Sequence, residues 1–149
     1  MGKIFVPVTG PSESKKAINY AVNIAKLFNL ELVVINVIDK ESLSKLERYR
    51  IFVEEESALF KEDMKKDAEK YLNYAKKLAE QANVNIITVL LEGDPFTLLQ
   101  EYINNDPDKL KFVCIAKRNE TEIINEIFGS IEKKLITRTN FNIIIVGEQ

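Results

Sequence analysis

Five short apolar runs, separated by segments with helical periodicity, constrain the fold of this chain more than any other feature. The runs are the expected strands, and they cover residues 3–8, 31–38, 85–91, 112–115 and 142–146. The second run, ELVVINVI, is almost continuously apolar, which is typical of a strand buried on both faces of a parallel sheet. Strands that alternate with helices along a whole chain predict a parallel α/β sheet with right-handed crossovers and helices on both faces.

The segments between these runs carry apolar residues at helical spacing. A first helix is expected to begin at Ser12 or Ser14, either of which can cap it, and to end at Asn29. Asp94 and Pro95 suit the cap and the first position of a later helix. The other expected helices cover about 64–83, 96–103 and about 121–137. The segment 39–63 scatters apolar residues among many charges, which predicts broken helix and loop.

Composition narrows the class of protein. The chain has 149 residues, and we expect one domain over residues 1–149. A net charge of −2 argues against a nucleic-acid binder, and neither a polybasic patch nor an apolar stretch of about 20 residues indicates a membrane. The first expected strand begins so close to Met1 that no signal peptide fits before it. We therefore expect a cytoplasmic protein.

The chain contains no histidine and a single cysteine, Cys114. This excludes His general bases, Ser-His and Cys-His pairs, and His metal ligands. Cys114 lies inside an apolar run, where a buried, inert thiol is expected. For hydrolysis of ATP, the polar candidates near strand ends are Thr9, Asp39 and Asp94, and each is more simply interpreted as a turn or cap residue. We expect no catalytic residue, no metal site and no enzyme activity.

The segment 112–131, FVCIAKRNETEIINEIFGSI, has the layout of an anion-binding loop. An apolar run gives way to a polar loop with Lys117 and Arg118, and Gly129-Ser130 precedes a helical pattern. Free backbone N–H groups and the positive end of the helix dipole attract phosphate at such a helix start, and a serine hydroxyl adds a donor. The two cations are candidate phosphate contacts, although solvated loop charges are the simpler interpretation. Close packing at Gly129 and capping by Ser130 are the structural alternatives.

This spacing resembles the universal stress protein family, whose nucleotide-binding members carry Gly, two residues, Gly, nine residues, and then Gly-Ser or Gly-Thr. Ala116 and Asn119 stand at the first two glycine positions of this chain, and Gly129-Ser130 keeps the third. The opening strand, turn and Ala-rich helix, and the turn at 92–95, are also similar to the family. The resemblance implies a doubly wound five-stranded parallel sheet in the order 3-2-1-4-5, of the adenine nucleotide alpha hydrolase-like type.

The resemblance also implies a nucleotide site in the crevice between the first and fourth strands, beyond their carboxyl ends. The residues that it places there are Pro7, Thr9, Val37, Ala116, Asn119, Gly129, Ser130 and Ile131. In this arrangement Val37 forms the adenine-side wall, and Lys117 and Arg118 are the candidate phosphate contacts. The implied ligand is ATP or AMP.

Three departures from the family pattern bear on that site. Thr9 stands where nucleotide-binding members have an Asp that binds the ribose, and a hydroxyl cannot form a charged bidentate contact. Ala116 adds a Cβ where glycine is usual, whereas Asn119 tolerates the left-handed conformation better than most residues. We therefore expect a stress-response regulatory protein with weak or absent ATP binding. The alternative is a member that binds ATP or another adenine nucleotide in this crevice.

The last expected strand is an apolar edge that contains Ile143, Ile144, Ile145 and Val146. An edge of this kind promotes association unless it is paired or covered. In the family the last strand often pairs with its twin across a two-fold axis, so the resemblance implies a homodimer. The alternative is a monomer in which helices cover this strand.

Overall fold

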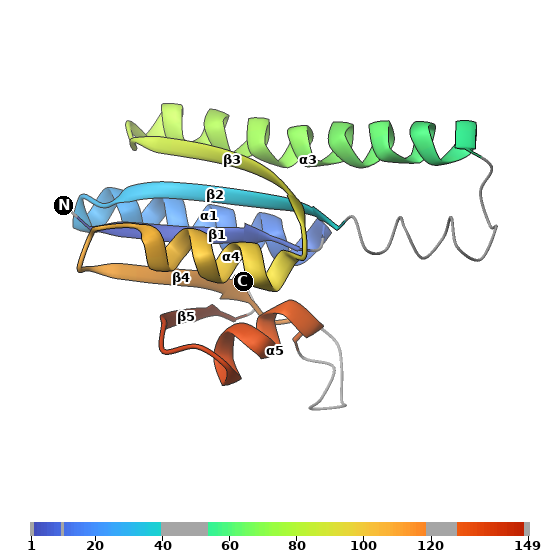
Figure 1. Ribbon diagram of the computed structural model, residues 1–149. Coiled ribbons are helices and arrows are strands. Elements are labelled where there is room, and N and C mark those ends of the chain that lie inside the picture. Colours follow the sequence, from blue (N-terminus) through green and yellow to red (C-terminus); the bar gives the residue numbers. More distant parts are fainter. Residues whose placement is uncertain (1, 10, 40–53, 119–127, 148–149) are drawn as a thin grey trace.

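The computed structural model describes residues 2–9, 11–39, 54–118 and 128–147. Its five strands form one parallel sheet in the order β3-β2-β1-β4-β5, which confirms the expected topology (Figure 1). The elements in chain order are β1 (Lys3–Val8), α1 (Pro11–Phe28), β2 (Glu31–Asp39), α3 (Glu54–Ala82), β3 (Ile86–Gly93), α4 (Pro95–Asn105), β4 (Lys111–Ala116), α5 (Ser130–Thr137) and β5 (Asn142–Val146).

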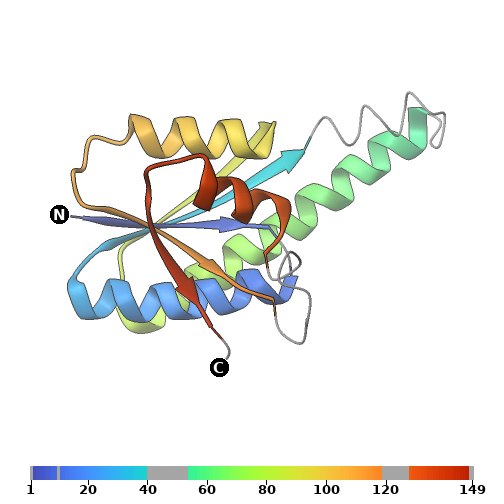
Figure 2. The ribbon, with the colours of Figure 1, turned by 90° about the horizontal axis from the view of Figure 1, so that it is seen from below.

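Helices cover both faces of this sheet, with α1 and α3 on one side and α4 and α5 on the other (Figure 2). Alternate residues of each central strand enter the two resulting cores. Ile4 and Val6 of β1 pack in the core beneath α1 and α3, whereas Phe5 packs beneath α4 and α5. This burial on both faces explains why the central strands are continuously apolar in sequence.

Local sequence signals set several helix ends. The carboxylate of Asp94 accepts a hydrogen bond from the backbone N–H of Thr97 at 2.9 Å, so it caps α4, with Pro95 in the first turn. Asn29 and Asn83 follow α1 and α3 with φ of 55° and 56°. Asparagine is the residue besides glycine that best tolerates this left-handed conformation, so it ends both helices without a glycine.

Helix α3 begins earlier than the sequence pattern predicts. The interpretation of 39–63 as broken helix and loop is wrong for Glu54–Asp63, which belongs to the 29-residue α3; residues 40–53 lie outside the described part. This first part of the helix projects past the carboxyl ends of the strands, and its sequence shows little apolar periodicity (Figure 1). Ion pairs at 3.4 Å from Lys61 and Lys65 to Glu92 at the end of β3 tie it to the sheet.

The starts of two other helices also differ from expectation. Helix α1 begins at Pro11, so Ser12 and Ser14 lie inside its first turn rather than at its cap. Helix α5 begins at Ser130, because Gly129 is its N-cap with an extended backbone (φ −69°, ψ 173°). A continuous helix from about Thr121 to Thr137 is therefore wrong, and 121–127 lie outside the described residues.

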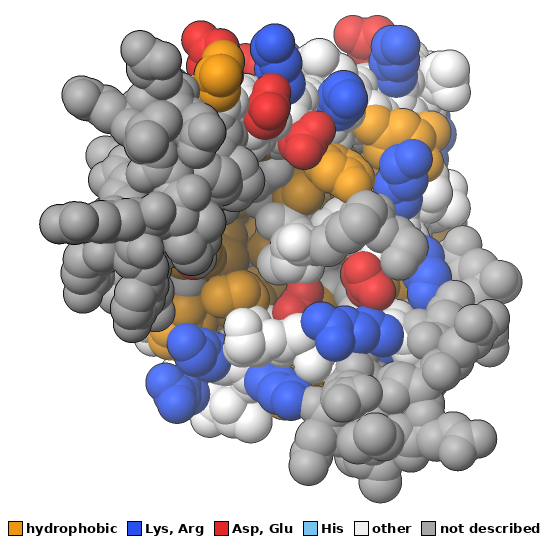
Figure 3. Space-filling view, turned by 90° about the vertical axis from the view of Figure 1, so that its right-hand side faces the viewer, with side chains coloured by type: hydrophobic (Ala, Val, Ile, Leu, Met, Phe, Trp, Pro, Cys, Tyr) orange, Lys and Arg blue, Asp and Glu red, His pale blue; other side chains and the backbone are white. Residues whose placement is uncertain are grey.

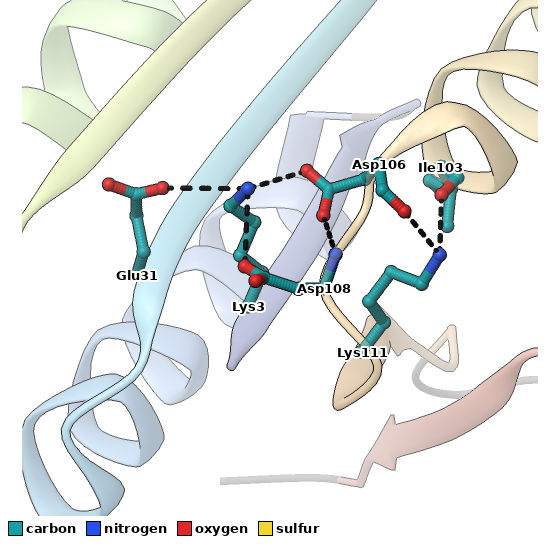
Figure 4. Close-up of polar contacts among 6 residues, drawn as sticks. All are labelled: Lys3, Glu31, Ile103, Asp106, Asp108 and Lys111. Atoms are coloured by element: carbon teal, nitrogen blue, oxygen red, sulfur yellow. Dashed lines mark hydrogen bonds and ion pairs between the residues drawn. The ribbon is translucent and has the colours of Figure 1, made fainter. Parts of the chain in front are cut away.

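A charged cluster joins the amino ends of the strands, opposite the predicted site (Figure 4). The Lys3 ammonium donates a hydrogen bond to Asp106 at 2.6 Å and lies 3.2 Å from Asp108. Lys111 donates to the carbonyls of Ile103 and Asp106 at the end of α4, each at 3.0 Å. These contacts bind β1 and β4 to the loop between α4 and β4.

The ionic contacts of this cluster shift two pKa values. The hydrogen bond to Asp106 raises the pKa of Lys3 above its ordinary value, although burial opposes the shift. Burial acts to raise the pKa of Asp106, but hydrogen bonds from Lys3 and the backbone of Asp108, with the charges of Lys3 and Lys111, outweigh burial and lower it. Both shifts favour the charged forms, so this cluster stabilises the folded state between acid and strongly alkaline pH.

Candidate functional site

The candidate site lies where β1 and β4 end, at the point where the strand order reverses. β1 pairs with β2 along one edge and with β4 along the other, so the chain crosses over in opposite directions from this strand. Crevices of open α/β sheets form at such switch points, beyond the carboxyl ends of the strands. Figure 3 looks onto this end of the molecule, where Lys, Arg, Asp and Glu side chains lie among hydrophobic ones.

The inner part of the crevice is a small hollow of about 170 Å³. It is lined by Thr9, Glu13, Ala116, Arg118, Gly129, Ser130, Ile131 and Glu132. The fold thus brings the end of β1, the end of β4 and the first turn of α5 together, as the resemblance implies. The two carboxylates of this lining, Glu13 and Glu132, are residues that sequence reasoning missed.

Gly129 is required here by close approach rather than by an unusual backbone conformation. A Cβ on Gly129 would lie 2.6 Å from Oε2 of Glu132 and 3.3 Å from Nη2 of Arg118. Because the φ of Gly129 is −69°, an L side chain is conformationally allowed, but its Cβ would require the Glu132 carboxylate to shift. The glycine therefore lets a carboxylate and a guanidinium come close to the backbone at the start of α5.

Glu132 fills the position at which the sequence predicts an anion. It is the third residue of α5, only 6% of it is exposed, and its Oε1 accepts a hydrogen bond from the hydroxyl of Thr9. A carboxylate in the first helical turn is favoured by the helix dipole, and a glutamate three residues after the cap reaches back toward the cap. The spacing from Gly129 to Glu132 is the sequence signal that could have identified it.

Thr9 connects three elements through two hydrogen bonds. Its backbone N–H donates to Oγ of the buried Ser14 in α1 at 2.9 Å, and its hydroxyl donates to Glu132 in α5. A hydroxyl has one hydrogen to donate, so Thr9 can offer a further ligand only acceptor lone pairs. The residue that replaces the usual Asp is thus already engaged within the protein.

The outer part of the crevice is a larger hollow of about 690 Å³ between the ends of β1 and β2 and helix α3. Its lining consists of Val8, Thr9, Lys15, Asn36, Val37, Ile38, Asp39, Met64, Asp67, Ala68, Lys70, Tyr71 and Tyr74. Tyr74 donates a hydrogen bond to Asn19 at 3.1 Å, and the ammonium of Lys15 lies 5.4 Å from the centre of its ring. The volume is within the range of small-molecule sites, and Thr9 lines both hollows.

The other predicted site residues are placed as follows. Val37 lines the outer hollow, and Pro7 lies in the narrow cleft beneath Thr9. The backbone N–H of Lys117 donates to the carbonyl of Val146 at 3.1 Å, so this residue extends the β4–β5 pairing and does not line either hollow. Asn119 lies outside the described residues. Of the two candidate phosphate contacts, Arg118 is the one at the inner hollow.

The chemistry open to this site depends on the reactivity of the cysteine and on the capacity of the described residues to hold a metal ion. Cys114 is buried in β4, and burial raises the pKa of its thiol to about 12, which agrees with the expected inert thiol. Within residues 2–9, 11–39, 54–118 and 128–147, no group of three or more Cys, Asp or Glu side chains is placed to hold a metal ion. The crevice thus offers hydrogen-bonding and charged groups suited to binding.

Comparisons with known proteins agree with the fold. The sequence profile of the Universal stress protein family matches residues 1–147. A universal stress protein of Methanocaldococcus jannaschii is 28% identical over 144 residues, which are 97% of this chain and 81% of that protein. Over the described helices, none is long and apolar enough to cross a bilayer.

Solved structures share the fold at lower sequence identity. The universal stress protein UspA from Lactobacillus plantarum superposes with a TM-score of 0.71 at 17% identity, covering 97% of this chain and 96% of that one. The universal stress protein from Archaeoglobus fulgidus in complex with dAMP gives a TM-score of 0.61 at 14% identity, covering 97% of both chains. At these identities the likeness shows the fold and not the ligand.

Proposed function

Because the chain belongs to the universal stress protein family, we propose that it is a non-catalytic stress-response regulatory protein that binds ATP weakly or not at all. The observation that carries this proposal is the position of Glu132. Its buried carboxylate lies at the start of α5, beside Gly129 and within hydrogen-bonding distance of Thr9. These are the residues from which a phosphate would otherwise draw its donors.

The alternative is a protein that binds an adenine nucleotide such as ATP or AMP in the same crevice. The outer hollow supports it, since about 690 Å³ lined by Val37 and two tyrosines suits an organic ligand. A relative of the same fold has been solved with dAMP. Arg118 at the inner hollow is a cation that a phosphate could contact.

Two measurements on the wild-type protein separate these proposals. Isothermal titration with ATP–Mg²⁺ at millimolar concentration is expected to give no more than weak heats and a negligible rise in the melting temperature. Mass spectrometry of the denatured protein, purified without added ligand, is expected to release no adenine nucleotide. Submicromolar affinity, or stoichiometric ATP or AMP in the released fraction, would establish the alternative instead.

Absence of catalysis is part of the proposal. The chain has no histidine, and the carboxylate of Asp94, one of the candidates near a strand end, caps α4 through Thr97. Thr9 is hydrogen-bonded to Glu132. Phosphate release from ATP is therefore expected to stay at the level of the protein-free blank, and turnover above that level that co-purifies with the protein would contradict the proposal.

We also propose that β5 joins two copies of the chain. β5 lies at the end of the sheet order, and Ile145 is 48% exposed, whereas Val146 is buried. A parallel edge strand with an exposed apolar side chain is suited to pairing with an identical strand. A monomer remains the alternative, and light scattering at micromolar concentration distinguishes the two.

A further inference from the structure

We propose that Glu132 is a built-in substitute for a phosphate group, and that it makes the crevice discriminate against phosphorylated ligands in favour of uncharged ones. This inference rests on the proposed function and adds its cause and the class of ligand that the crevice accepts. It names one residue as the determinant of specificity, so it can fail while the proposed function stands.

The first step is the position of the two carboxylate oxygens. Oε1 accepts the hydrogen bond of Thr9, and Oε2 lies 2.6 Å from the point where a Cβ on Gly129 would stand. Nη2 of Arg118 lies 3.3 Å from that same point. One oxygen therefore takes the hydroxyl donor, and the other takes the space that Gly129 leaves open next to a guanidinium. A bound phosphate would need the same donor and the same space.

The second step is the burial of the carboxylate. Only 6% of Glu132 is exposed, so its side chain has lost much of its contact with water, and its carboxylate depends on protein groups for compensation. The Thr9 hydroxyl and the positive end of the α5 dipole supply that compensation. A phosphate can enter only if Glu132 leaves these partners, so ligand binding competes with contacts that stabilise the folded protein.

The third step is the charge around the inner hollow. Its lining carries the carboxylates of Glu13 and Glu132 and the guanidinium of Arg118, so acidic groups exceed basic ones among the lining residues. Like charges at close range repel one another, and they do so more strongly in a protein than in bulk water. A phosphate with a charge near −2 would therefore be repelled as well as excluded.

The fourth step is the contrast with the outer hollow. Its lining contains two lysines, Lys15 and Lys70, and two aspartates, Asp39 and Asp67, so the positive and negative charges are equal in number. Val8, Val37 and Ile38 provide apolar wall in the same hollow. An uncharged body with polar edges, such as a nucleoside, can occupy this space without extending to Glu132. The crevice is thus open to a nucleoside at its outer end and closed to phosphate at its inner end.

The decisive experiment compares the wild type with Glu132→Ser and Glu132→Gln in binding to ATP–Mg²⁺, AMP and adenosine. Glu132→Ser removes the charge and opens the space, whereas Glu132→Gln removes the charge and keeps the shape and a possible bond with Thr9. Glu13→Gln is the matched control, because it removes a carboxylate from the same hollow but not from the start of α5. Circular dichroism and melting temperature verify that each variant folds.

We expect Glu132→Ser to bind ATP and AMP at least about tenfold more tightly than the wild type, while the adenosine affinity changes by less than about threefold. Glu132→Gln should show a smaller gain in the same direction, and it keeps the test valid if the serine variant does not fold. Glu13→Gln should change nucleotide binding less than either.

Unchanged nucleotide affinity in folded Glu132 variants would overturn the inference, and so would an equal gain for adenosine, because both would show that the carboxylate does not select against phosphate. If the wild type binds ATP weakly and the variants bind no better, the proposed function stands and this inference fails. If the wild type already binds ATP tightly, the proposed function fails. The ratio between variant and wild type then still decides whether Glu132 opposes phosphate.

Discussion

The hydroxyl of Thr9 donates a hydrogen bond to the carboxylate of Glu132 across a sequence separation of 123 residues. The bond joins the carboxyl end of β1 to the first turn of α5 and closes the inner end of the crevice. A threonine at this position in place of an aspartate is consistent with a carboxylate on the opposite wall, because two facing carboxylates would repel one another.

Replacing Thr9 with valine should destabilise the fold. The substitution removes the hydroxyl that compensates a nearly buried carboxylate, so we expect the free energy of unfolding to fall by about 1–3 kcal/mol. Urea denaturation monitored by circular dichroism measures this change. Thr137→Val is the control, since its exposed hydroxyl donates to the carbonyl of Lys133 in its own helix, and that loss should cost less. Equal effects of the two substitutions would show that the bond to Glu132 contributes nothing special.

A side chain at Gly129 should collide with Glu132. The added methyl group of Gly129→Ala would lie 2.6 Å from Oε2 of Glu132, so the carboxylate must move and the fold should lose roughly 1–3 kcal/mol. In the background of Glu132→Ser the same substitution should cost much less, because the colliding atom is gone. A double-mutant cycle measures this coupling. Additive effects in the cycle would argue against the contact.

The cluster around Lys3 should make stability depend on pH at both extremes. The pKa of Asp106 is lowered in the folded state, so its contribution is present above its ordinary value of 3.8 and disappears as the pH falls through the lowered pKa. The pKa of Lys3 is raised, so its contribution is complete below 10.5 and disappears as the pH rises through the raised pKa.

Asp106→Asn tests the acidic half of this dependence. The variant should be less stable than the wild type, and this difference should be largest near neutral pH. It should shrink at pH values below about 3.8, because Asp106 of the wild type then becomes protonated. Urea denaturation at pH values between about 2 and 8 measures this difference in the free energy of unfolding. Asp67→Asn, at an exposed position of α3, is the control and should show little change. A difference that stays constant down to the lowest pH would contradict the assignment.

Cys114 should be unreactive in the native protein. Its thiol is buried in β4 with its pKa raised to about 12, so very little thiolate is present or accessible at neutral pH. Labelling with a disulfide reagent should be negligible under native conditions and should go to completion in urea. Rapid native labelling would mean that β4 opens locally without global unfolding.

Placing a charge on β5 should weaken the proposed dimer. Ile145→Lys puts an ammonium on the exposed apolar position of this edge strand and should shift the mass measured by light scattering toward the monomer. Ile87→Lys is the matched control, since Ile87 is a partly exposed isoleucine on β3 at the other end of the sheet order. A dimer that survives in Ile145→Lys, or a wild type that is monomeric, would contradict the role of β5.

Strand positions followed closely from the sequence, and helix starts did not. Buried parallel strands leave continuous apolar runs, so β1 begins and ends where the pattern predicts. The edge strand β5 also matches its apolar run, although it is only partly buried. The first residues of α3, 54–63, extend past the carboxyl ends of the strands and show no clear apolar periodicity in the sequence, so the pattern did not predict a helix there. Lys61 and Lys65 of this helix form ion pairs with Glu92. The start of α5 was misplaced because the helical pattern in the sequence does not mark a break, whereas Gly129 has an extended backbone and is the N-cap of α5.

The order of apolar runs and helical segments by itself determined the layered α/β class, because strand burial and helical periodicity leave a record along the chain. The adjacency of Thr9, Ala116 and Gly129-Ser130 was an expectation from the resemblance to the family. Only the tertiary structure decided what occupies the place that these residues surround. In the sequence, Glu132 is an ordinary acid in a first helical turn. Folding removes it from water and sets it against a hydroxyl far away in the chain, and neither burial nor a distant partner can be inferred from local spacing.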